Sequence, residues 1–334
     1  MKYDMKKWLA DCRDANIKKA IPILSFPGMQ LIGCTVEELV KNGHLQALCM
    51  KKIADKYDTW ASFSMMDLSV EAEAFGAEVV YKKDEVPTVH GALLTSMKEA
   101  EALEVPKVGV GRTEEYLKGI KEAKELITDR PIFAGIIGPY SLAGRLLDMT
   151  EIMILCYEEP EFVEVVLEKV TRFLISYVKA FKEAGADGIV MAEPAAGLLS
   201  PELMKEFSNP YVENVKEIAE SEELLFIYHN CGNITPLMDP ISEIKADVYS
   251  VGNAVDMEAV LQGLPKESVI IGNLDPAGII RNGTPELIEN ETRKLLEQCK
   301  SYSNFIPSSG CDIPPATPIR NIDAFFKAVK DFYC

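Results

Sequence analysis

Short apolar runs alternate with amphipathic helical patterns along most of this 334-residue chain. Each run ends in turn-forming residues and has the length of a strand rather than of a helix. Strands that alternate with helices in this way are typical of a parallel sheet covered by helices. The runs begin near residues 21, 60, 131, 188, 224, 247, 268 and 305. No G-x-G-x-x-G follows the first of them, so an open dinucleotide-binding sheet lacks its fingerprint. Roughly eight strand–helix units favour an α/β fold of the (β/α)8 TIM-barrel type.

One domain is expected over residues 1–334, because no low-complexity linker or clear internal repeat divides the chain. Residues 1–58 are interpreted as a helical N-terminal extension and residues 59–334 as the barrel. Within the extension, helices are expected over 3–15 and around 35–42 and 44–57. A hairpin is expected at 78–91. Longer helices are predicted at 161–184, 201–220, 284–300 and 319–332.

A candidate metal site begins with His229 and Cys231, which lie where the strand at 224–227 gives way to a loop. Strand side chains alternate between faces, so these two residues point to the same side. Cys311 follows another strand and supplies a third ligand. Three such ligands with one position left open are typical of catalytic zinc, since structural zinc sites are usually closed by four. The alternative is a buried neutral histidine with two inert core cysteines.

Carboxylates also lie at the predicted strand ends. Asp67 and Glu193 each follow a strand, and in a TIM barrel the C-terminal strand ends share the face that holds the active site. Both are therefore expected near the metal ligands and are candidate catalytic residues. Glu193 is a candidate for the fourth zinc position, with a salt bridge at the barrel mouth as the alternative. Asp67 either orients a ligand or caps the helical turn that follows it.

The charge balance of the chain restricts its partners. Asp and Glu number 52 against 35 Lys and Arg, which gives a formal net charge of −17. Such a surface repels nucleic acid and anionic membranes, and neither is expected as a partner. The N-terminal residues show an amphipathic helix rather than a signal peptide, and no apolar run approaches ~20 residues. A cytoplasmic protein is expected. Its eight cysteines show no disulfide rhythm and are interpreted as thiols.

Three segments resemble those of uroporphyrinogen decarboxylases: MMDLSVEAEAFG at 65–76, IFAGIIGPYSLAGRLLD at 132–148 and IIGNLDPAGII at 270–280. The His-x-Cys pair with a distant Cys is similar to the zinc-dependent methyltransferase branch of this superfamily, which contains the methylcobamide:coenzyme M methyltransferases. The resemblance implies a (β/α)8 barrel with zinc held by His229, Cys231 and Cys311. It also implies a methylated corrinoid, which is expected on a separate partner protein because the chain shows no corrinoid-binding D-x-H-x-x-G pattern.

The function implied by this resemblance is transfer of a methyl group from a methylated corrinoid protein to a small-molecule acceptor. The acceptor is a thiol such as coenzyme M, or tetrahydrofolate. A zinc-bound thiolate would attack the methyl group of a methyl-Co(III) corrinoid and leave Co(I). One alternative is a decarboxylase of the uroporphyrinogen type. Residues 22–33 weigh against it, because they contain none of the arginines that a substrate with many carboxylates needs. Another is a non-enzymatic zinc- or corrinoid-binding accessory protein, since fold alone does not establish activity.

Further residues near predicted strand ends are candidates for contact with the cofactor or substrate. Tyr140 follows the strand at 131–139, Asn233 follows the His229 strand, and Asp275 follows the strand at 268–273. Loop formation is the alternative for Asn233, and a helix start is the alternative for Asp275. Arg145 lies in the helix after Tyr140 and is a candidate for binding an anionic tail on the substrate thiol. A structural salt bridge is its alternative.

Overall fold

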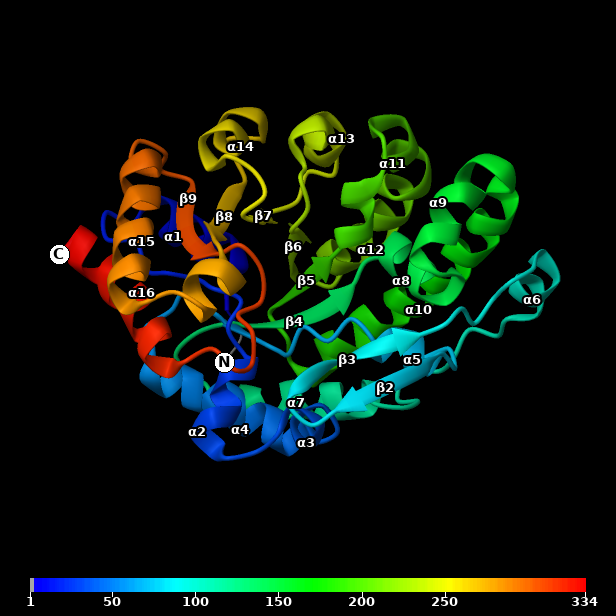
Figure 1. Cartoon of the computed structure of the whole chain (residues 1–334), viewed down its shortest axis with the longest axis horizontal. Helices are drawn as coiled ribbons and strands as arrows, with labels where there is room; N and C mark the ends of the chain where they lie inside the picture. Colours follow the sequence, from blue (N-terminus) through cyan, green and yellow to red (C-terminus); the bar gives the residue numbers. More distant parts are fainter. Residues whose placement is uncertain (1–2) are drawn as a thin grey trace.

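The computed structural model describes residues 3–334 and shows seven parallel strands that curl around a central axis, with helices outside them (Figure 1). Neighbouring strands follow one another in sequence, apart from a two-stranded hairpin inserted after the first. This is the TIM-barrel-like α/β fold that the alternation predicts. The strands of the sheet are β1 (Ser62–Phe63), β4 (Ile132–Ile137), β5 (Gly188–Ala192), β6 (Leu225–Asn230), β7 (Val248–Val251), β8 (Val269–Leu274) and β9 (Phe305–Ser309).

Burial explains why the strands read as unbroken apolar runs. In β4 to β9 every residue except Gly135 is buried, as a parallel sheet covered on both faces requires. One set of side chains points inward and packs in a central cluster that includes Phe133, Val190, Ile227 and Val269. The alternate set packs against the helices in a larger, outer cluster. A residue's parity along its strand therefore decides whether it faces the barrel interior or the helices.

Residues 21–24 occupy the place of an eighth strand beside β9. Ile21 N donates to Pro307 O at 3.0 Å, and Ile313 N donates to Ile23 O at 3.0 Å. Ile21 also joins the central cluster. Within residues 3–334, no backbone hydrogen bond links this segment to β1, so side-chain packing closes the barrel on that side. The division into an extension and a barrel at residue 58 stays a prediction, but residues 21–24 lie in the barrel wall.

The helices agree closely with the expected ranges. Predicted helix 201–220 is divided at Ser208, because Pro210 follows and cannot donate a backbone hydrogen bond within a continuous helix. No helix within residues 3–334 combines the length and apolar character needed to cross a bilayer. The helices are α1 (Met5–Asp14), α2 (Met29–Ile32), α3 (Val36–Val40), α4 (Gly43–Lys56), α5 (Val70–Ala74), α6 (Met97–Ala102), α7 (Thr113–Leu126), α8 (Pro139–Leu147), α9 (Met149–Glu158), α10 (Pro160–Ala184), α11 (Pro201–Phe207), α12 (Asn209–Ser221), α13 (Met238–Glu243), α14 (Met257–Gly263), α15 (Pro285–Cys299) and α16 (Ile319–Tyr333), with short turns η1 (Phe26–Gly28), η2 (Pro194–Leu198), η3 (Thr235–Leu237) and η4 (Pro276–Arg281).

The region between β1 and β4 departs from simple strand–helix alternation. The predicted hairpin is present as antiparallel β2 (Glu78–Lys82) and β3 (Glu85–His90). β1 is shorter than the apolar run at 60–66. Gly135 N on β4 donates its hydrogen bond to Ser64 Oγ at 2.8 Å instead of to a backbone carbonyl of β1. The strand ladder ends there, and the chain turns toward Asp67 at the mouth of the barrel.

Candidate metal centre

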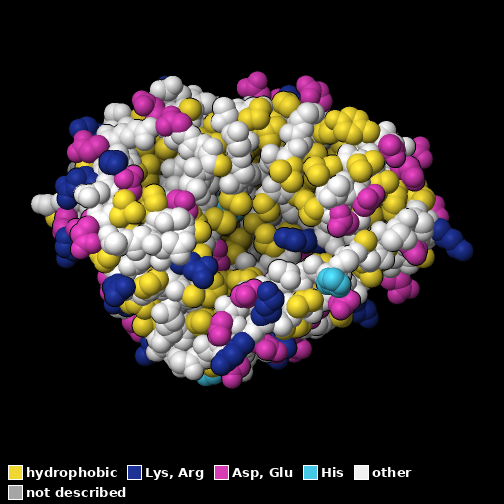
Figure 2. All heavy atoms as spheres, viewed as in Figure 1, with side chains coloured by type: hydrophobic (Ala, Val, Ile, Leu, Met, Phe, Trp, Pro, Cys, Tyr) yellow, Lys and Arg dark blue, Asp and Glu magenta, His cyan; other side chains and the backbone are white. Residues whose placement is uncertain are grey.

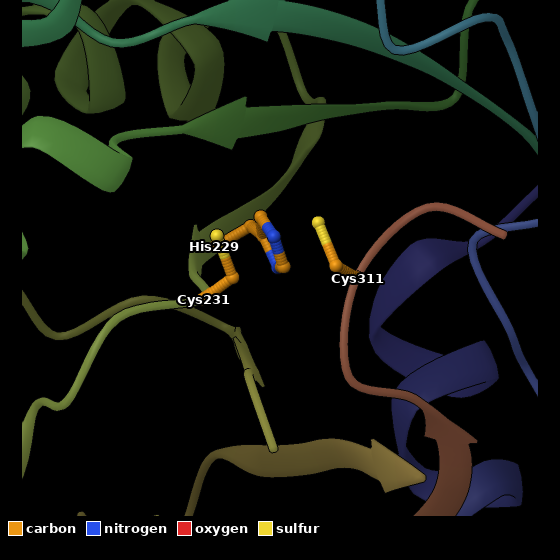
Figure 3. Close-up of side chains that lie close together, drawn as sticks. All are labelled: His229, Cys231 and Cys311. Carbon is orange, nitrogen blue, oxygen red and sulfur yellow. The ribbon is translucent and has the colours of Figure 1, made fainter. Parts of the chain in front are cut away.

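His229, Cys231 and Cys311 come together at the C-terminal end of the barrel strands (Figure 3). His229 is the fifth residue of β6, and its parity matches that of Ile227, which faces the barrel interior. Cys231 follows β6, and Cys311 lies in the loop after β9. One ligand atom from each residue lies within 4.8 Å of the other two. The three side chains proposed from spacing therefore meet across β7 and β8.

The environment of His229 fits a metal ligand. The side chain is 2% exposed, and its Nδ1 lies 2.9 Å from Ser250 Oγ on β7. His229 Nε2 is buried and has no hydrogen-bond partner within residues 3–334. A buried polar atom without a partner is costly in a folded protein. If Nδ1 carries the proton and donates it to Ser250, the lone pair of Nε2 is free to bind a metal ion.

A hydrogen bond between the two cysteine side chains shifts the pKa values of both thiols in opposite directions. The hydrogen bond from Cys311 lowers the pKa of the Cys231 thiol to about 4, and His229 acts in the same direction against the effect of burial. The same contact, together with burial, raises the pKa of Cys311. The contact therefore favours the thiolate form at Cys231 and the thiol form at Cys311. A soft sulfur pair next to an imidazole nitrogen is a donor set that suits zinc.

Two glycines allow the ligand loops to pass close to neighbouring backbone. A Cβ atom on Gly252 would lie 2.4 Å from the Cys231 carbonyl oxygen, and one on Gly310 would lie 2.7 Å from Asn253 N. Neither approach tolerates a side chain, because backbone atoms cannot move aside. Gly252 N also donates to Asn230 O at 3.1 Å, and Gly310 N donates to Leu274 O at 2.7 Å. The backbone next to each cysteine is thus fixed by the adjacent strand end.

A small cavity of about 70 Å³ opens beside the ligands. All three ligand side chains line it, together with apolar side chains that include Met66, Ala192 and Pro194. Apolar walls strengthen electrostatic interactions within such a site because they exclude water. The face shown in Figure 2 is hollowed near its centre, where apolar side chains gather. The cavity gives a small molecule access to the place where the three ligand atoms converge.

The Glu193 backbone lies next to His229, but the Glu193 carboxylate points to α8. It is 0% exposed, and its oxygens accept hydrogen bonds from Tyr140 N at 2.8 Å and Ser141 N at 2.9 Å. A carboxylate is favourable there, because the first N–H groups of a helix have no partner within the helix. The group of ligand atoms within 4.8 Å does not include Glu193, and no ion pair involves it within residues 3–334. Glu193 N donates to His229 O at 2.9 Å, but within residues 3–334 its carboxylate neither forms a salt bridge nor joins the clustered ligand atoms. Its catalytic role stays a prediction.

Asp67 forms a buried ion pair with Arg112. It also accepts hydrogen bonds from Tyr116 Oη at 3.1 Å and from Ser69 N at 3.0 Å. Arg112 contacts Glu73 as well, at 2.6 Å. The bond from Ser69 N resembles the cap that was the alternative interpretation of Asp67. The structure thus places Asp67 at the barrel mouth but satisfies its oxygens within the protein, and a catalytic role stays a prediction.

Comparison with known proteins identifies the family. Residues 18–332 match the model of the family described as Uroporphyrinogen decarboxylase (URO-D). The chain belongs to the uroporphyrinogen decarboxylase family. It is 28% identical over 312 residues to the methylcobamide:CoM methyltransferase MtbA of Methanosarcina acetivorans, with 89% of this chain and 90% of that protein covered. It is 24% identical over 316 residues to a uroporphyrinogen decarboxylase of Coxiella burnetii, with 90% and 83% covered.

A solved structure supports the same placement within the uroporphyrinogen decarboxylase family. A methyltransferase from Methanosarcina mazei superposes with a TM-score of 0.85 at 25% identity, and the match covers 98% of each chain. A vitamin-B12-independent methionine synthase from Listeria monocytogenes superposes with a TM-score of 0.57 at 13% identity, which shows the shared fold alone. The barrel is therefore the fold of this family, and the resemblance seen in the three sequence segments is confirmed.

The remaining predicted contact residues of this family member have local partners. Tyr140 is buried, and its hydroxyl lies 3.7 Å from Cys156 Sγ. Asn233 is exposed and accepts a hydrogen bond from Thr235 N at 3.2 Å, as its loop-forming alternative requires. Asp275 accepts from Ala277 N at 2.9 Å and Gly278 N at 2.8 Å and so begins the η4 turn. Contact of these residues with a corrinoid stays a prediction.

Sequence reasoning missed three residues of the site. Ser250 lies in an apolar strand, and only the register of β6 and β7 pairs it with His229. Arg112 follows a segment without periodicity and carries no motif. Asp312 follows Cys311 directly and lines the cavity, and its Oδ1 is buried without a hydrogen-bond partner within residues 3–334. Proximity to Cys311 in the sequence was the one signal that could have identified Asp312.

Proposed function

We propose that this protein is a zinc-dependent methyltransferase that moves a methyl group from a methylated corrinoid protein to the sulfur of coenzyme M or a similar thiol. The observation that carries the proposal is the cluster of His229, Cys231 and Cys311 around a cavity at the barrel mouth. The similarity to a methylcobamide:CoM methyltransferase supports the choice of donor and acceptor. Tetrahydrofolate is a second acceptor to test. The corrinoid is expected on a partner protein.

The donor set supports zinc as the metal. Two cysteines and one histidine are ligands found in zinc enzymes that keep one position open for water or substrate. Zinc held by these residues would keep a bound thiol deprotonated near neutral pH and so nucleophilic. In the proposed reaction the acceptor sulfur forms a bond to the methyl carbon, the carbon–cobalt bond breaks, and its electron pair remains with cobalt. No proton needs to reach the product sulfur.

The residues of the chain have separate tasks in this proposal. Ser250 fixes the orientation of the His229 ring through the 2.9 Å contact with Nδ1. The hydrogen bond from Cys311 favours the thiolate form of Cys231, which is the form that binds a metal ion. The apolar wall formed by Met66, Ala192 and Pro194 excludes water from the reacting sulfur. Together they bind, orient and shield the acceptor.

The proposal is tested by offering free methylcobalamin with a panel of acceptors to protein loaded with zinc. We expect cob(I)alamin to appear in the absorption spectrum, under anaerobic conditions, when a thiol acceptor is present. The Cys311→Ala variant is expected to bind little zinc and to show no transfer above the uncatalysed rate. An absence of transfer to every thiol and to tetrahydrofolate, by protein shown to contain zinc, would contradict the proposed function. A zinc- or corrinoid-binding accessory protein would then be the better interpretation.

A further inference from the structure

Arg145 on α8 carries a charge that no residue within 3–334 neutralises by contact. Among the lysines and arginines of residues 3–334, it is the one that is neither exposed nor joined to a partner by a hydrogen bond or an ion pair. Every other residue of α8 is buried. The sequence suggested a structural salt bridge as one interpretation of Arg145, and the structure contains no such bridge.

Arg145 lies on α8, the helix that begins at the C-terminal end of β4. Arg145 lies four residues after Ser141 and so on the same side of α8. Ser141 Oγ accepts a hydrogen bond from Ala195 N at 3.0 Å, which places this side of the helix against η2. Pro194, the residue before Ala195, lines the cavity.

Asp67 is the charged residue that acts on Arg145. Burial lowers the pKa of Arg145, while the nearby charge of Asp67 acts in the opposite direction. Met66 and Leu68, the two neighbours of Asp67 in sequence, both line the cavity. Asp67 itself cannot neutralise Arg145 by contact, because its oxygens are bound to Arg112, Tyr116 and Ser69. The acidic residue whose charge acts on Arg145 is thus flanked in sequence by two residues of the cavity wall.

The chemistry of the guanidinium group indicates which kind of ligand Arg145 can bind. Arginine stays protonated in proteins, so partial burial cannot be relieved by loss of the proton. A charge removed from water without a partner is unfavourable. The planar group with its paired N–H donors matches the geometry of carboxylate, sulfonate and phosphate groups. An anionic ligand would therefore satisfy Arg145 where the protein does not.

We infer that Arg145 binds the anionic end of the methyl acceptor, and that the acceptor is a small thiol carrying one sulfonate or carboxylate group. The sulfur would then lie at His229, Cys231 and Cys311, and the anion at Arg145. This inference rests on the proposed function. One available arginine suits a single anionic group rather than a substrate with many carboxylates.

The test compares pairs of thiols that differ in charge but little in size, such as 2-mercaptoethanesulfonate and 2-mercaptoethanol. We expect Arg145→Ala to raise KM for the anionic thiol by about 10- to 100-fold, as loss of a charge-assisted hydrogen bond does, with little change in kcat. The KM for the neutral thiol should stay within about twofold. Arg145→Lys should restore part of the discrimination, because it keeps the charge but not the paired donors. Arg293→Ala, an exposed arginine on α15, is the matched control.

A binding measurement gives a readout that does not need turnover. The methylated sulfonate product and its neutral analogue are titrated into wild-type and variant protein by calorimetry, both with and without zinc. The sulfonate should bind wild-type protein more tightly, and Arg145→Ala should remove this preference. Equal ratios of anionic to neutral affinity in wild type and Arg145→Ala would overturn the inference while leaving the methyl transfer intact. Absence of transfer to any thiol, with the binding preference still present, would instead contradict the proposed function. A change in the response to methylcobalamin, with thiol binding unaffected, would assign Arg145 to an anionic group of the corrinoid and also overturn the inference.

Discussion

His229 and Ser250 are register partners on the neighbouring strands β6 and β7, and His229 Nδ1 lies 2.9 Å from Ser250 Oγ. Both side chains are buried, at 2% and 0% exposure, so water cannot replace the hydroxyl. The contact occupies Nδ1, so Nε2, which has no hydrogen-bond partner within residues 3–334, is the ring atom left available to a metal ion. A seryl hydroxyl therefore decides the orientation of a metal ligand from one strand away.

Replacing Ser250 by Ala should weaken zinc binding without removing it. Loss of a hydrogen bond to a metal-binding histidine typically costs 10- to 100-fold in affinity. The measurement is competition for zinc with a chromophoric chelator. Ser303→Ala, on the surface-facing turn before β9, serves as a control for the effect of a lost hydroxyl. Wild-type affinity in Ser250→Ala would show that the ring is held by packing alone.

Replacing Cys231 or Cys311 by Ala should remove most of the metal, because two ligands rarely hold zinc in an open site. About one zinc per chain is expected in the wild-type protein. The measurement is metal content by atomic emission, with circular dichroism to show that the barrel is folded. Cys334→Ala, an exposed thiol at the C-terminus, is the control. Unchanged metal in both ligand variants would eliminate the site.

Glu193→Gln should retain zinc, since the three clustered ligands remain, and should change the pH dependence of stability. Burial raises the pKa of Glu193 to about 7, against hydrogen bonds from Ser141 and Tyr140. A raised pKa favours the protonated form in the folded state, so this contribution to stability is full below about pH 4.5 and is lost as pH rises to about 7. The side chain in Glu193→Gln cannot ionise, so the variant does not lose stability in this way as pH rises.

The stability advantage of wild type over Glu193→Gln should therefore decrease between about pH 5 and pH 7.5. Urea unfolding at both pH values measures it. Glu71, whose pKa is also raised to about 7 by burial, acts equally in both proteins and cancels. A slower methyl transfer in Glu193→Gln with unchanged stability would support the catalytic role predicted from sequence. Loss of zinc would show that the carboxylate moves to the metal.

Arg112→Ala should destabilise the fold by about 3–5 kcal/mol, because it leaves the buried Asp67 carboxylate without its cationic partner. Urea unfolding of the variant measures the change. Arg172→Ala, exposed on α10, should alter stability by no more than about 0.5 kcal/mol. If Arg112→Ala does not fold well enough to measure, Asp67→Asn breaks the same pair from the other side. A small effect in both variants would mean that Asp67 and Arg112 are free to act in catalysis.

Uroporphyrinogen should not be decarboxylated by this protein, although the chain belongs to the family named for that reaction. Residues 22–33 contain no arginine, and within residues 3–334 the one arginine that is neither exposed nor paired is Arg145. The measurement is chromatography of porphyrin products after oxidation. The same preparation must be active in methyl transfer, which excludes inactive protein as the reason. Formation of coproporphyrinogen would reverse this assignment.

Much of the barrel was predictable from sequence because buried parallel strands show as unbroken apolar runs. The clustering of three side chains was predictable too, since His229 and Cys231 share a face and Cys311 follows another strand. What spacing alone does not supply is register. The pairing of Ser250 with His229 and that of Arg112 with Asp67 depend on which strands and helices become neighbours in space.

Glu193 shows where sequence reasoning stopped too early. Val190 faces the barrel interior, and Glu193, three residues later, has the opposite parity. That parity directs its carboxylate to the helical layer, where it meets the N-terminus of α8. Position at a strand end was correctly taken as proximity to the mouth, but the alternation of side chains decides which side of the wall a carboxylate occupies.

The wall of the barrel has a seam. Around most of the barrel, backbone hydrogen bonds join each strand to the next. Residues 21–24 form such bonds only on the side of β9. One of those hydrogen bonds is donated by Ile313, two residues beyond Cys311, so the loop that carries Cys311 also belongs to this weakly bonded part of the wall. We expect local opening of the barrel wall to occur first between residues 21–24 and β1. Amide protons of Ile21 and Ile313 should exchange with deuterated solvent sooner than those of β5 and β6. A metal ion bound by Cys311 together with His229 and Cys231 would link this loop to β6 and so slow the exchange.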